Sequence, residues 1–355
     1  MLSTTLFPFG QNTVKTAICF ASDRNYLDYT FVAIQSIIEH ASDDYCYDIV
    51  ILGTDCAGRE EPFRSLFSKN VSVRILDMEA YIEKFGMRDF YVSGNIPMAS
   101  YFRFFIPEIF SEYSKVLYLD GDVLVCDDVK FLLAEDLGDA LVGAVRDAGT
   151  LALPKKRQAY LEKRLGVSPE KYFCSGIMLY NVEACNAFNF SNRCIAKLEE
   201  LVAPPYHDQD VLNSVTRGRV KQIPLRWHLI TTVLPLVEMN RLSGGADVTA
   251  EYQKAIKEPG ILHYAGAKPW NEDRIALADL WWKTADATSV GLSLRLRLER
   301  KRSNRLEEAV SFMGLPWLFL TYSFYKLVTL FAAGERRKEY KRRAKLLKYI
   351  IRHGI

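Results

Sequence analysis

Two aspartates separated by one glycine, Asp120-Gly121-Asp122, are the strongest candidates for metal chemistry in the sequence. They follow the apolar run Val116–Leu119, so we expect the turn to emerge at the edge of a sheet, where such folds bind ligands. Two close carboxylates can hold a divalent ion, which stabilises the negative charge growing on a leaving diphosphate. Gly121 has no Cβ, which lets a diphosphate approach the backbone closely. Because an Asp-X-Asp sequence alone is more often a surface turn, its position carries the hypothesis.

A second candidate segment begins at His263 and continues through Gly266 and Lys268. An imidazole together with two carboxylates suits Mn²⁺ or a similar borderline ion, with diphosphate oxygens completing the shell. Gly266 permits tight backbone passage, and Lys268 supplies a positive charge for phosphate. A histidine at a strand end is more often a packing or capping residue. The metal hypothesis therefore requires the two segments to meet.

The loop Ala21–Tyr26 offers polar groups suited to a nucleoside. Asp23 and Asn25 provide an acceptor and a donor for a base edge or a ribose, and Tyr26 could stack on a flat ring. The same Asp-X-Asn pair is also ordinary helix-capping chemistry. Both interpretations remain open at this point.

The elements that must position these residues follow from the apolar periodicity. Short apolar, β-branched runs alternate with helical patterns in the first half of the chain, the order typical of a parallel α/β sheet. The expected strands are Thr16–Ala21, Asp48–Gly53, Val71–Asp77, Lys115–Leu119, Gly176–Tyr180 and Ile261-Leu262. The expected helices are Tyr29–His40, Glu60–Phe67 and Asp208–Thr216. Each candidate segment thus follows or begins an element of the sheet.

Composition is that of a folded protein with reduced thiols. The chain has 355 residues, 49% hydrophobic and 25% charged, which predicts one large catalytic domain and an appendage. Its seven cysteines are odd in number and include no Cys-X-X-Cys pair of the zinc or redox kind. The first eleven residues contain no basic side chain and do not resemble a secretory signal. We expect a cytoplasmic location.

The C-terminal part differs sharply in charge. Residues 291–355 contain 16 Lys and Arg against 5 Asp and Glu, which leaves residues 1–290 with a net charge of −8. The apolar stretch Met313–Phe331 raises the question of a membrane span, but Pro316 and Lys326 interrupt it. Its aromatics are grouped rather than spaced among the charges, which argues against nucleic acid. We expect a basic, amphipathic helical segment over 286–355 that attaches peripherally to the inner face of the cell membrane.

Six ordered segments resemble glycosyltransferase family 8, and most closely its bacterial lipooligosaccharide galactosyltransferase branch. They are Ala21–Tyr26, Tyr101-Phe102-Arg103, Val116–Val125, Phe173–Asn181, Asp208-Gln209-Asp210 and His263–Trp270. The resemblance implies an α/β fold of the GT-A type over residues 12–285, with a Rossmann-like mixed sheet flanked by helices. It also implies a hexosyltransferase that moves galactose or glucose from a UDP-sugar to a saccharide acceptor of lipopolysaccharide, lipooligosaccharide or another surface glycan.

The resemblance assigns roles to individual residues. Asp120, Asp122 and His263 would bind Mn²⁺, with Mg²⁺ as the alternative. The UDP-hexose would contact Ala21, Ser22, Asp23, Asn25 and Tyr26 with its uridine, Gly121, Gly266 and Lys268 with its diphosphate, and Arg103, Asp147, Asp208 and Gln209 with its sugar. One departure concerns Cys174-Ser175-Gly176, because the family usually has Asn where this chain has Cys174. The contact usually made by that Asn is therefore in doubt.

The resemblance also implies retention of anomeric configuration, by a covalent intermediate or by attack from the same face as the leaving group. An amide is a poor nucleophile, so we favour same-face attack in which Gln209 and Asp208 stabilise positive charge. Two other function classes compete with this interpretation. A sugar-nucleotide nucleotidyltransferase would need a glycine-rich phosphate loop after the first strand, and Ala21–Tyr26 contains no glycine. A non-catalytic membrane adaptor would explain the tail alone.

Overall fold

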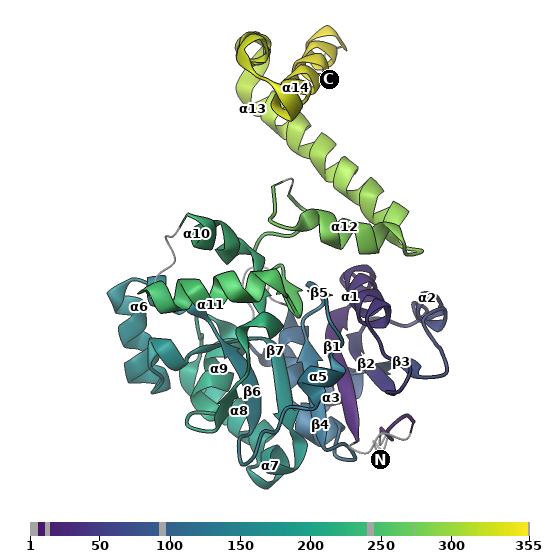
Figure 1. Ribbon diagram of the computed structural model, residues 1–355, viewed down its shortest axis with the longest axis vertical. Helices are drawn as coiled ribbons and strands as arrows, with labels where there is room; N and C mark the ends of the chain where they lie inside the picture. Colours follow the sequence, from purple (N-terminus) through teal and green to yellow (C-terminus); the bar gives the residue numbers. More distant parts are fainter. Residues whose placement is uncertain (1–5, 11–14, 92–96, 240–244, 273, 354–355) are drawn as a thin grey trace. The chain divides into compact units, whose positions relative to one another are not determined.

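The computed structural model describes residues 6–10, 15–91, 97–239, 245–272 and 274–353, so residues 12–14 of the predicted catalytic domain lie outside it. Two compact units are present, residues 1–291 and 292–355. The first unit is built on a seven-stranded sheet with the order β3-β2-β1-β4-β7-β6-β8 (Figure 1). Its strands are β1 (Thr16–Asp23), β2 (Tyr47–Thr54), β3 (Val71–Asp77), β4 (Lys115–Leu119), β6 (Val142–Arg146), β7 (Phe173–Asn181) and β8 (Val220–Gln222).

The sheet is mixed, as the family resemblance implied. Strand β1 runs parallel to β2 and β4, and β2 runs parallel to β3. Strand β7 runs antiparallel to both β4 and β6. Strand β2 is buried along its whole length except for Thr54, which explains why it reads as a continuous apolar run.

A second, three-stranded sheet has the order β5-β10-β9. Strand β5 (Val123–Val125) pairs antiparallel with β10 (Ile261–His263), and β10 pairs parallel with β9 (Leu229–Ile230). The β5–β10 pairing brings together segments that are more than a hundred residues apart in the sequence. His263, expected just after a strand, is the last residue of β10.

Helices surround the strands of the first unit (Figure 1). They are α1 (Leu27–Glu39), α2 (Glu61–Arg64), α3 (Glu79–Lys84), α4 (Ile106–Ile109), α5 (Lys130–Leu133), α6 (Lys155–Tyr160), α7 (Val182–Ala187), α8 (Phe190–Leu201), α9 (His207–Val215), α10 (Leu234–Glu238), α11 (Gly245–Lys257) and α12 (Ala278–Asp286). The prediction of a helix over Glu60–Phe67 was too long. Of α2, only Phe63 is buried, so a longer helix would gain little from packing.

One 3₁₀-helix contributes several aromatic side chains to the hydrophobic core. Residues Met98–Phe104 bury Tyr101, Phe102 and Phe104 completely, and Phe105 follows in the same cluster. A 3₁₀-helix longer than four residues is uncommon, so tertiary packing holds this one in place. The same packing fixes the backbone that carries Arg103.

The second unit contains α14 (Gly334–His353) and all but the first residue of α13 (Gly291–Phe331). Gly334 has a φ of +58°, which glycine adopts readily in the turn between the two helices. Leu347 of α14 packs against Tyr322 and Tyr325 of α13. The side chains of residues 304–318, Trp317 among them, lie outside the description. Among the helices that are described, none combines the length and the apolar content needed to cross a bilayer.

A buried carboxylate ties the edge of the sheet to the core. Asp48 in β2 accepts hydrogen bonds from Arg74 Nη2 at 2.7 Å, from the Tyr113 hydroxyl at 2.6 Å and from the backbone N–H of Phe9 at 2.9 Å. Its side chain is fully buried, whereas that of Arg74 is one-third exposed. The Asp48 carboxylate thus accepts hydrogen bonds from three different segments of the chain.

We predict that Asp48→Ala destabilises the protein by roughly 2–4 kcal/mol, because it leaves a guanidinium and a hydroxyl without their acceptor. Denaturant unfolding measures the loss. Glu108→Ala is the matched control, because Glu108 forms a solvent-exposed pair with Lys84 and its removal should change stability little. Equal effects of the two substitutions would contradict the structural role of Asp48.

Candidate active site

Backbone pairing brings the predicted metal ligands together. Asp120 follows β4, and its N–H donates to the carbonyl of Gly176 in β7 at 2.8 Å. Asp122 precedes β5, and its carbonyl accepts from the N–H of Tyr264 at 2.9 Å. His263 lies opposite Val123 in the β5–β10 register. The two segments identified in the sequence therefore meet.

The three side chains form a set that fits a divalent ion. His263 Nε2 lies 3.1 Å from Asp122 Oδ1 and 3.8 Å from Asp120 Oδ2, and one ligand atom from each residue lies within 4.8 Å of the others. His263 and Asp122 are buried, with exposed fractions of 3% and 5%. Two carboxylates and an imidazole supply the oxygen and nitrogen donors that a borderline ion such as Mn²⁺ accepts. The residues present thus fit the metal that the sequence implies.

Lysine and imidazole hold Asp122 ionised. Burial opposes ionisation, but His263 and Lys268 outweigh it and hold the pKa of Asp122 well below its usual range. The Lys268 ammonium contacts Asp122 Oδ2 directly and donates to the Tyr264 carbonyl at 2.9 Å. The side chain predicted to face a phosphate is paired with a metal ligand in this structure.

The Arg103 guanidinium contacts two carboxylates that line the cavity. It donates from Nη2 to Asp120 Oδ1 at 2.8 Å, and its Nη1 lies 3.1 Å from Asp208 Oδ2. Nη1 also donates to the hydroxyl and the carbonyl of Ser175, and Nε donates to the Ser100 carbonyl. Burial opposes the charge of Arg103, but Asp120 and Asp208 raise its pKa well above the usual value. Arg103 therefore positions acidic groups as well as lining the cavity.

The predicted sugar-binding residues converge from three elements. Asp208 and Gln209 lie in the first turn of α9, and Asp147 follows β6. Ser175 donates its hydroxyl to Asp208 Oδ2 at 2.8 Å and its N–H to Gln209 Oε1 at 3.1 Å. Burial raises the pKa of both Asp208 and Asp147. The Gln209 amide is oriented by the backbone of β7.

At the end of β1, both interpretations of Asp23 are compatible with the structure. Asp23 Oδ1 accepts from the N–H groups of Asn25 and Tyr26, each at 2.9 Å, so its side chain organises the turn before α1. The Tyr26 ring packs edge-on against Trp270 at 6.0 Å. Asp23, Asn25 and Tyr26 also line the cavity, so the turn presents them to a ligand.

All fifteen predicted site residues line one cavity of about 910 Å³. They are Ala21, Ser22, Asp23, Asn25, Tyr26, Arg103, Asp120, Gly121, Asp122, Asp147, Asp208, Gln209, His263, Gly266 and Lys268. The individual roles that the resemblance assigns to them stay predictions.

Sequence reasoning missed two residues that contact the metal ligands. The Tyr118 hydroxyl donates to Asp120 Oδ1 at 2.8 Å. From the sequence, Tyr118 was expected only to form part of an apolar strand. His228 Nε2 lies 2.7 Å from His263 Nδ1, and burial lowers the pKa of His228 well below its usual value. The available signal for His228 was its rarity, because the chain has five histidines.

Comparison with known proteins gives a family match over most of the chain. The family model described as Glycosyl transferase family 8 matches residues 17–274. General stress protein A of Bacillus subtilis (strain 168) is 30% identical over 188 residues, which cover 51% of this chain and 62% of that protein. Lipopolysaccharide 1,2-glucosyltransferase of Escherichia coli (strain K12) is 26% identical over 276 residues, 76% of each protein.

A solved structure of an active-site mutant of LgtC is similar with a TM-score of 0.65 and 25% sequence identity, covering 77% of this chain and 96% of that chain. The chain spans between 60% and 62% of the length of three curated relatives that it matches.

We predict that Gly176→Ala weakens Mn²⁺ binding by at least about tenfold, because even the loss of an outer-shell partner typically reduces metal affinity about 10–100-fold. The new Cβ would lie 2.4 Å from His263 Cε1 and 2.8 Å from Asp120 Oδ2, so both ligands must move. Isothermal titration with Mn²⁺ measures the effect. Gly143→Ala in β6 is the control, because its added Cβ would lie 2.9 Å from the flexible end of Leu137 and near no metal ligand. Unchanged Mn²⁺ affinity in Gly176→Ala would contradict the ligand set.

Proposed function

The chain belongs to glycosyl transferase family 8 and has the GT-A type fold expected from its sequence, and on this premise we propose that it is a retaining hexosyltransferase. It transfers galactose or glucose from a UDP-sugar to a saccharide acceptor of a lipopolysaccharide, lipooligosaccharide or other surface glycan. The observation that carries the proposal is the meeting of Asp120, Asp122 and His263 in a cavity that also holds the predicted donor-binding residues. The Escherichia coli relative is itself named a lipopolysaccharide glucosyltransferase.

Donor binding uses three parts of the cavity. Asp23, Asn25 and Tyr26 contact the uridine from the turn that follows β1. Asp120, Asp122 and His263 would hold a divalent ion, Mn²⁺ or alternatively Mg²⁺, which when bound supplies positive charge to the diphosphate. Lys268 adds a second cation and exchanges its contact with Asp122 for a phosphate oxygen.

The sugar lies above Arg103, Asp147, Asp208 and Gln209. Gln209 Oε1 already accepts a hydrogen bond from the Ser175 N–H, and an amide is a weak nucleophile. We therefore favour same-face attack over a covalent sugar–enzyme intermediate. The bond from the anomeric carbon to the diphosphate breaks, the bond to the acceptor oxygen forms, and a diphosphate oxygen takes the acceptor's proton. Asp208, held by Arg103 and Ser175, stabilises positive charge that develops on the sugar.

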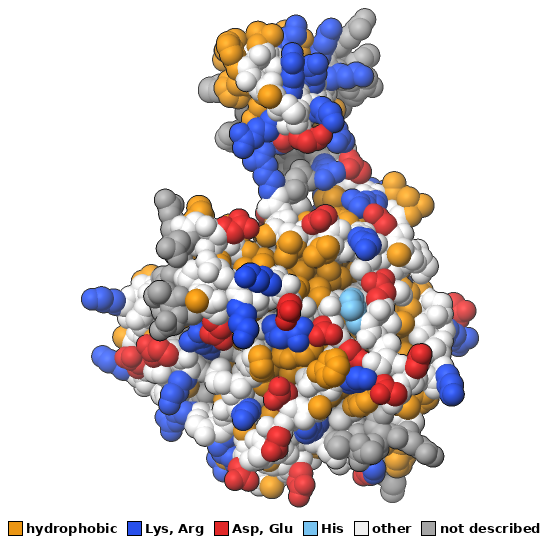
Figure 2. All heavy atoms as spheres, in the orientation of Figure 1, with side chains coloured by type: hydrophobic (Ala, Val, Ile, Leu, Met, Phe, Trp, Pro, Cys, Tyr) orange, Lys and Arg blue, Asp and Glu red, His pale blue; other side chains and the backbone are white. Residues whose placement is uncertain are grey.

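The second unit attaches the enzyme to the inner face of the cell membrane. Figure 2 shows Lys and Arg side chains gathered beside hydrophobic side chains on this unit. Exposed apolar residues follow one another along α13 at helical spacing: Leu320, Phe324, Leu327 and Phe331. Helix α14 adds exposed Lys341, Arg342 and Lys345. A basic helix beside an exposed apolar stripe matches an anionic bilayer surface.

We predict that Asp120→Asn lowers kcat/KM by about 10²–10³-fold, the usual effect of removing one group that stabilises transition-state charge. The assay is UDP release from a panel of UDP-sugars with Mn²⁺, with and without saccharide acceptors. Asp127→Asn is the matched control, because Asp127 pairs with Arg226 outside the cavity and should leave kcat/KM unchanged. Full activity of Asp120→Asn, or turnover that survives removal of divalent ions by chelator, would contradict the proposed function.

We also predict that replacing Lys341 and Arg342 by Gln weakens binding to phosphatidylserine vesicles by about 2 kcal/mol, since each basic residue contributes about 1 kcal/mol near an anionic surface. Vesicle co-sedimentation measures binding. The matched control replaces exposed Lys155 and Lys156 of the first unit by Gln and should have little effect. Equal losses in the two double variants would contradict the second unit as the membrane-binding part, and equal binding to zwitterionic vesicles would contradict the role of its basic residues.

A further inference from the structure

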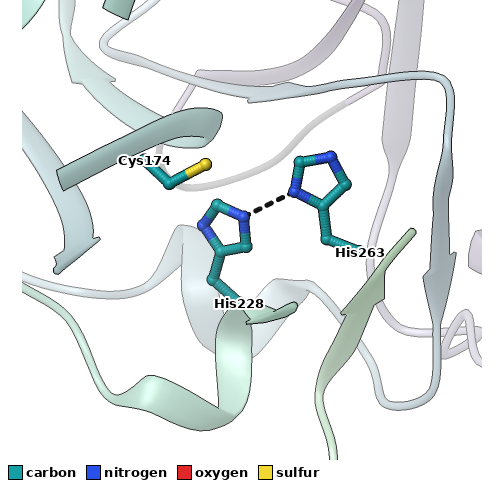
Figure 3. A group of neighbouring side chains, drawn as sticks. All are labelled: Cys174, His228 and His263. Atoms are coloured by element: carbon teal, nitrogen blue, oxygen red, sulfur yellow. Dashed lines mark hydrogen bonds between the residues drawn. The ribbon is translucent and has the colours of Figure 1, made fainter. Parts of the chain in front are cut away.

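A second cluster of metal-binding type lies beside the proposed ion site. It consists of Cys174 in β7, His228 just before β9 and His263 at the end of β10, and the thiol points toward the two rings (Figure 3). Cys174 Sγ and one ring nitrogen of each histidine lie within 4.8 Å of one another. All three residues are buried, and the exposed fraction of none exceeds 9%. Among the described residues, no other cluster of this kind joins a thiol to two imidazoles.

We propose that Cys174, His228 and His263 form a site for a thiophilic divalent ion such as Zn²⁺, and that this site competes with the Asp120–Asp122 site for His263. A thiolate and two imidazoles are ligands typical of Zn²⁺, whereas Mg²⁺ and Mn²⁺ prefer carboxylate and other oxygen ligands. The two sites should therefore select different ions.

His228 is placed as a ligand by its position. Its ring is 2% exposed, and its Nε2 lies 2.7 Å from Nδ1 of His263, the second imidazole of the cluster. Its Nδ1 has no hydrogen-bond partner among the described residues. A buried polar atom without a partner is unfavourable, so this pocket is not completed by the protein's own groups.

The tautomer of His263 makes the two sites mutually exclusive. A neutral imidazole has one protonated nitrogen and one nitrogen with a free lone pair. When Nε2 binds an ion beside Asp120 and Asp122, Nδ1 carries the proton and donates to His228 Nε2, 2.7 Å away. When Nδ1 binds an ion beside Cys174, Nε2 carries the proton and donates to Asp122 Oδ1, 3.1 Å away. Either tautomer therefore has its partner in place.

Asp122 changes its role between the two states. In the first it is a ligand, and in the second it is the carboxylate that orients a metal-bound histidine. Carboxylate–histidine–zinc arrangements of this second kind fix the ring and strengthen the ligand. The same buried carboxylate thus supports either site, but not both at once.

The thiol of Cys174 must lose its proton to solvent when the ion binds. Coordination to a divalent ion deprotonates a thiol outright. Cys174 and His263 both line the cavity, which gives the ion a route to the cluster. The competition rests on the ion site proposed above, whereas binding at the cluster does not.

Cobalt titration of the full-length, reduced protein tests the cluster directly, because Co²⁺ replaces Zn²⁺ and a bound thiolate gives an intense near-ultraviolet charge-transfer band. We expect one equivalent of Co²⁺ to produce the band and Zn²⁺ to abolish it by displacement. Cys174→Ser should remove the band and weaken Zn²⁺ binding by at least about 10–100-fold, the loss seen even for outer-shell partners. Cys126→Ser is the matched control, because Cys126 is a free, part-buried thiol outside the cavity, and it should keep the band.

The Asp120→Asn variant and added Mn²⁺ separate the two claims. Asp120→Asn should keep the cobalt–thiolate band, because Asp120 is a ligand of the first site alone, and this result does not depend on sugar transfer. Mn²⁺ at ten times its own Kd should weaken Co²⁺ binding to the wild-type cluster about tenfold, as mass action requires for exclusive sites. A wild-type protein without the band, or a band that persists in Cys174→Ser, would overturn the cluster. Co²⁺ affinity that is independent of Mn²⁺ would overturn the competition.

Discussion

The proposed active site depends on backbone hydrogen bonds at the strand ends of the two sheets. The Asp120 N–H donates to Gly176, and the Asp122 carbonyl accepts from Tyr264, so main-chain hydrogen bonds join three distant segments. Such bonds do not rely on side-chain chemistry. They therefore hold two carboxylates and an imidazole close together, although the two carboxylates repel each other.

The positive charges of Arg103 and Lys268 offset the repulsion between the carboxylates of the site. Arg103 contacts both Asp120 and Asp208, and Lys268 contacts Asp122. A buried charge is stable only with a partner, and Asp120, Asp122 and Asp208 each have one. Because Arg103 is shared, the proposed ion site and the proposed sugar site form one electrostatic unit. A change at Asp208 should be felt at Asp120 through the guanidinium.

Much of this architecture could be predicted from the sequence, for physical reasons. Strands β1 and β2 are largely buried and apolar, so the local sequence is enough to recognise them. The direction of β7 relative to β4 depends on its partners, which are not encoded in the strand itself. Asp120, Asp122 and His263 were found because they stand at the ends of apolar runs, and the family resemblance supplied Arg103, Asp147, Asp208 and Gln209. His228 contacts His263 across 35 residues, and no local spacing indicates that contact. Arg103 was expected beside the sugar, but its donors are directed largely at Asp120, Asp208 and Ser175.

The most direct measurement of the central claim is anomalous diffraction at the manganese edge, from crystals grown with Mn²⁺ and UDP. The account predicts a single strong peak within bonding distance of Asp120, Asp122 and His263 Nε2, with diphosphate oxygens of UDP completing the shell. A peak that lacks His263, or one located away from the β4–β5 turn, would contradict it.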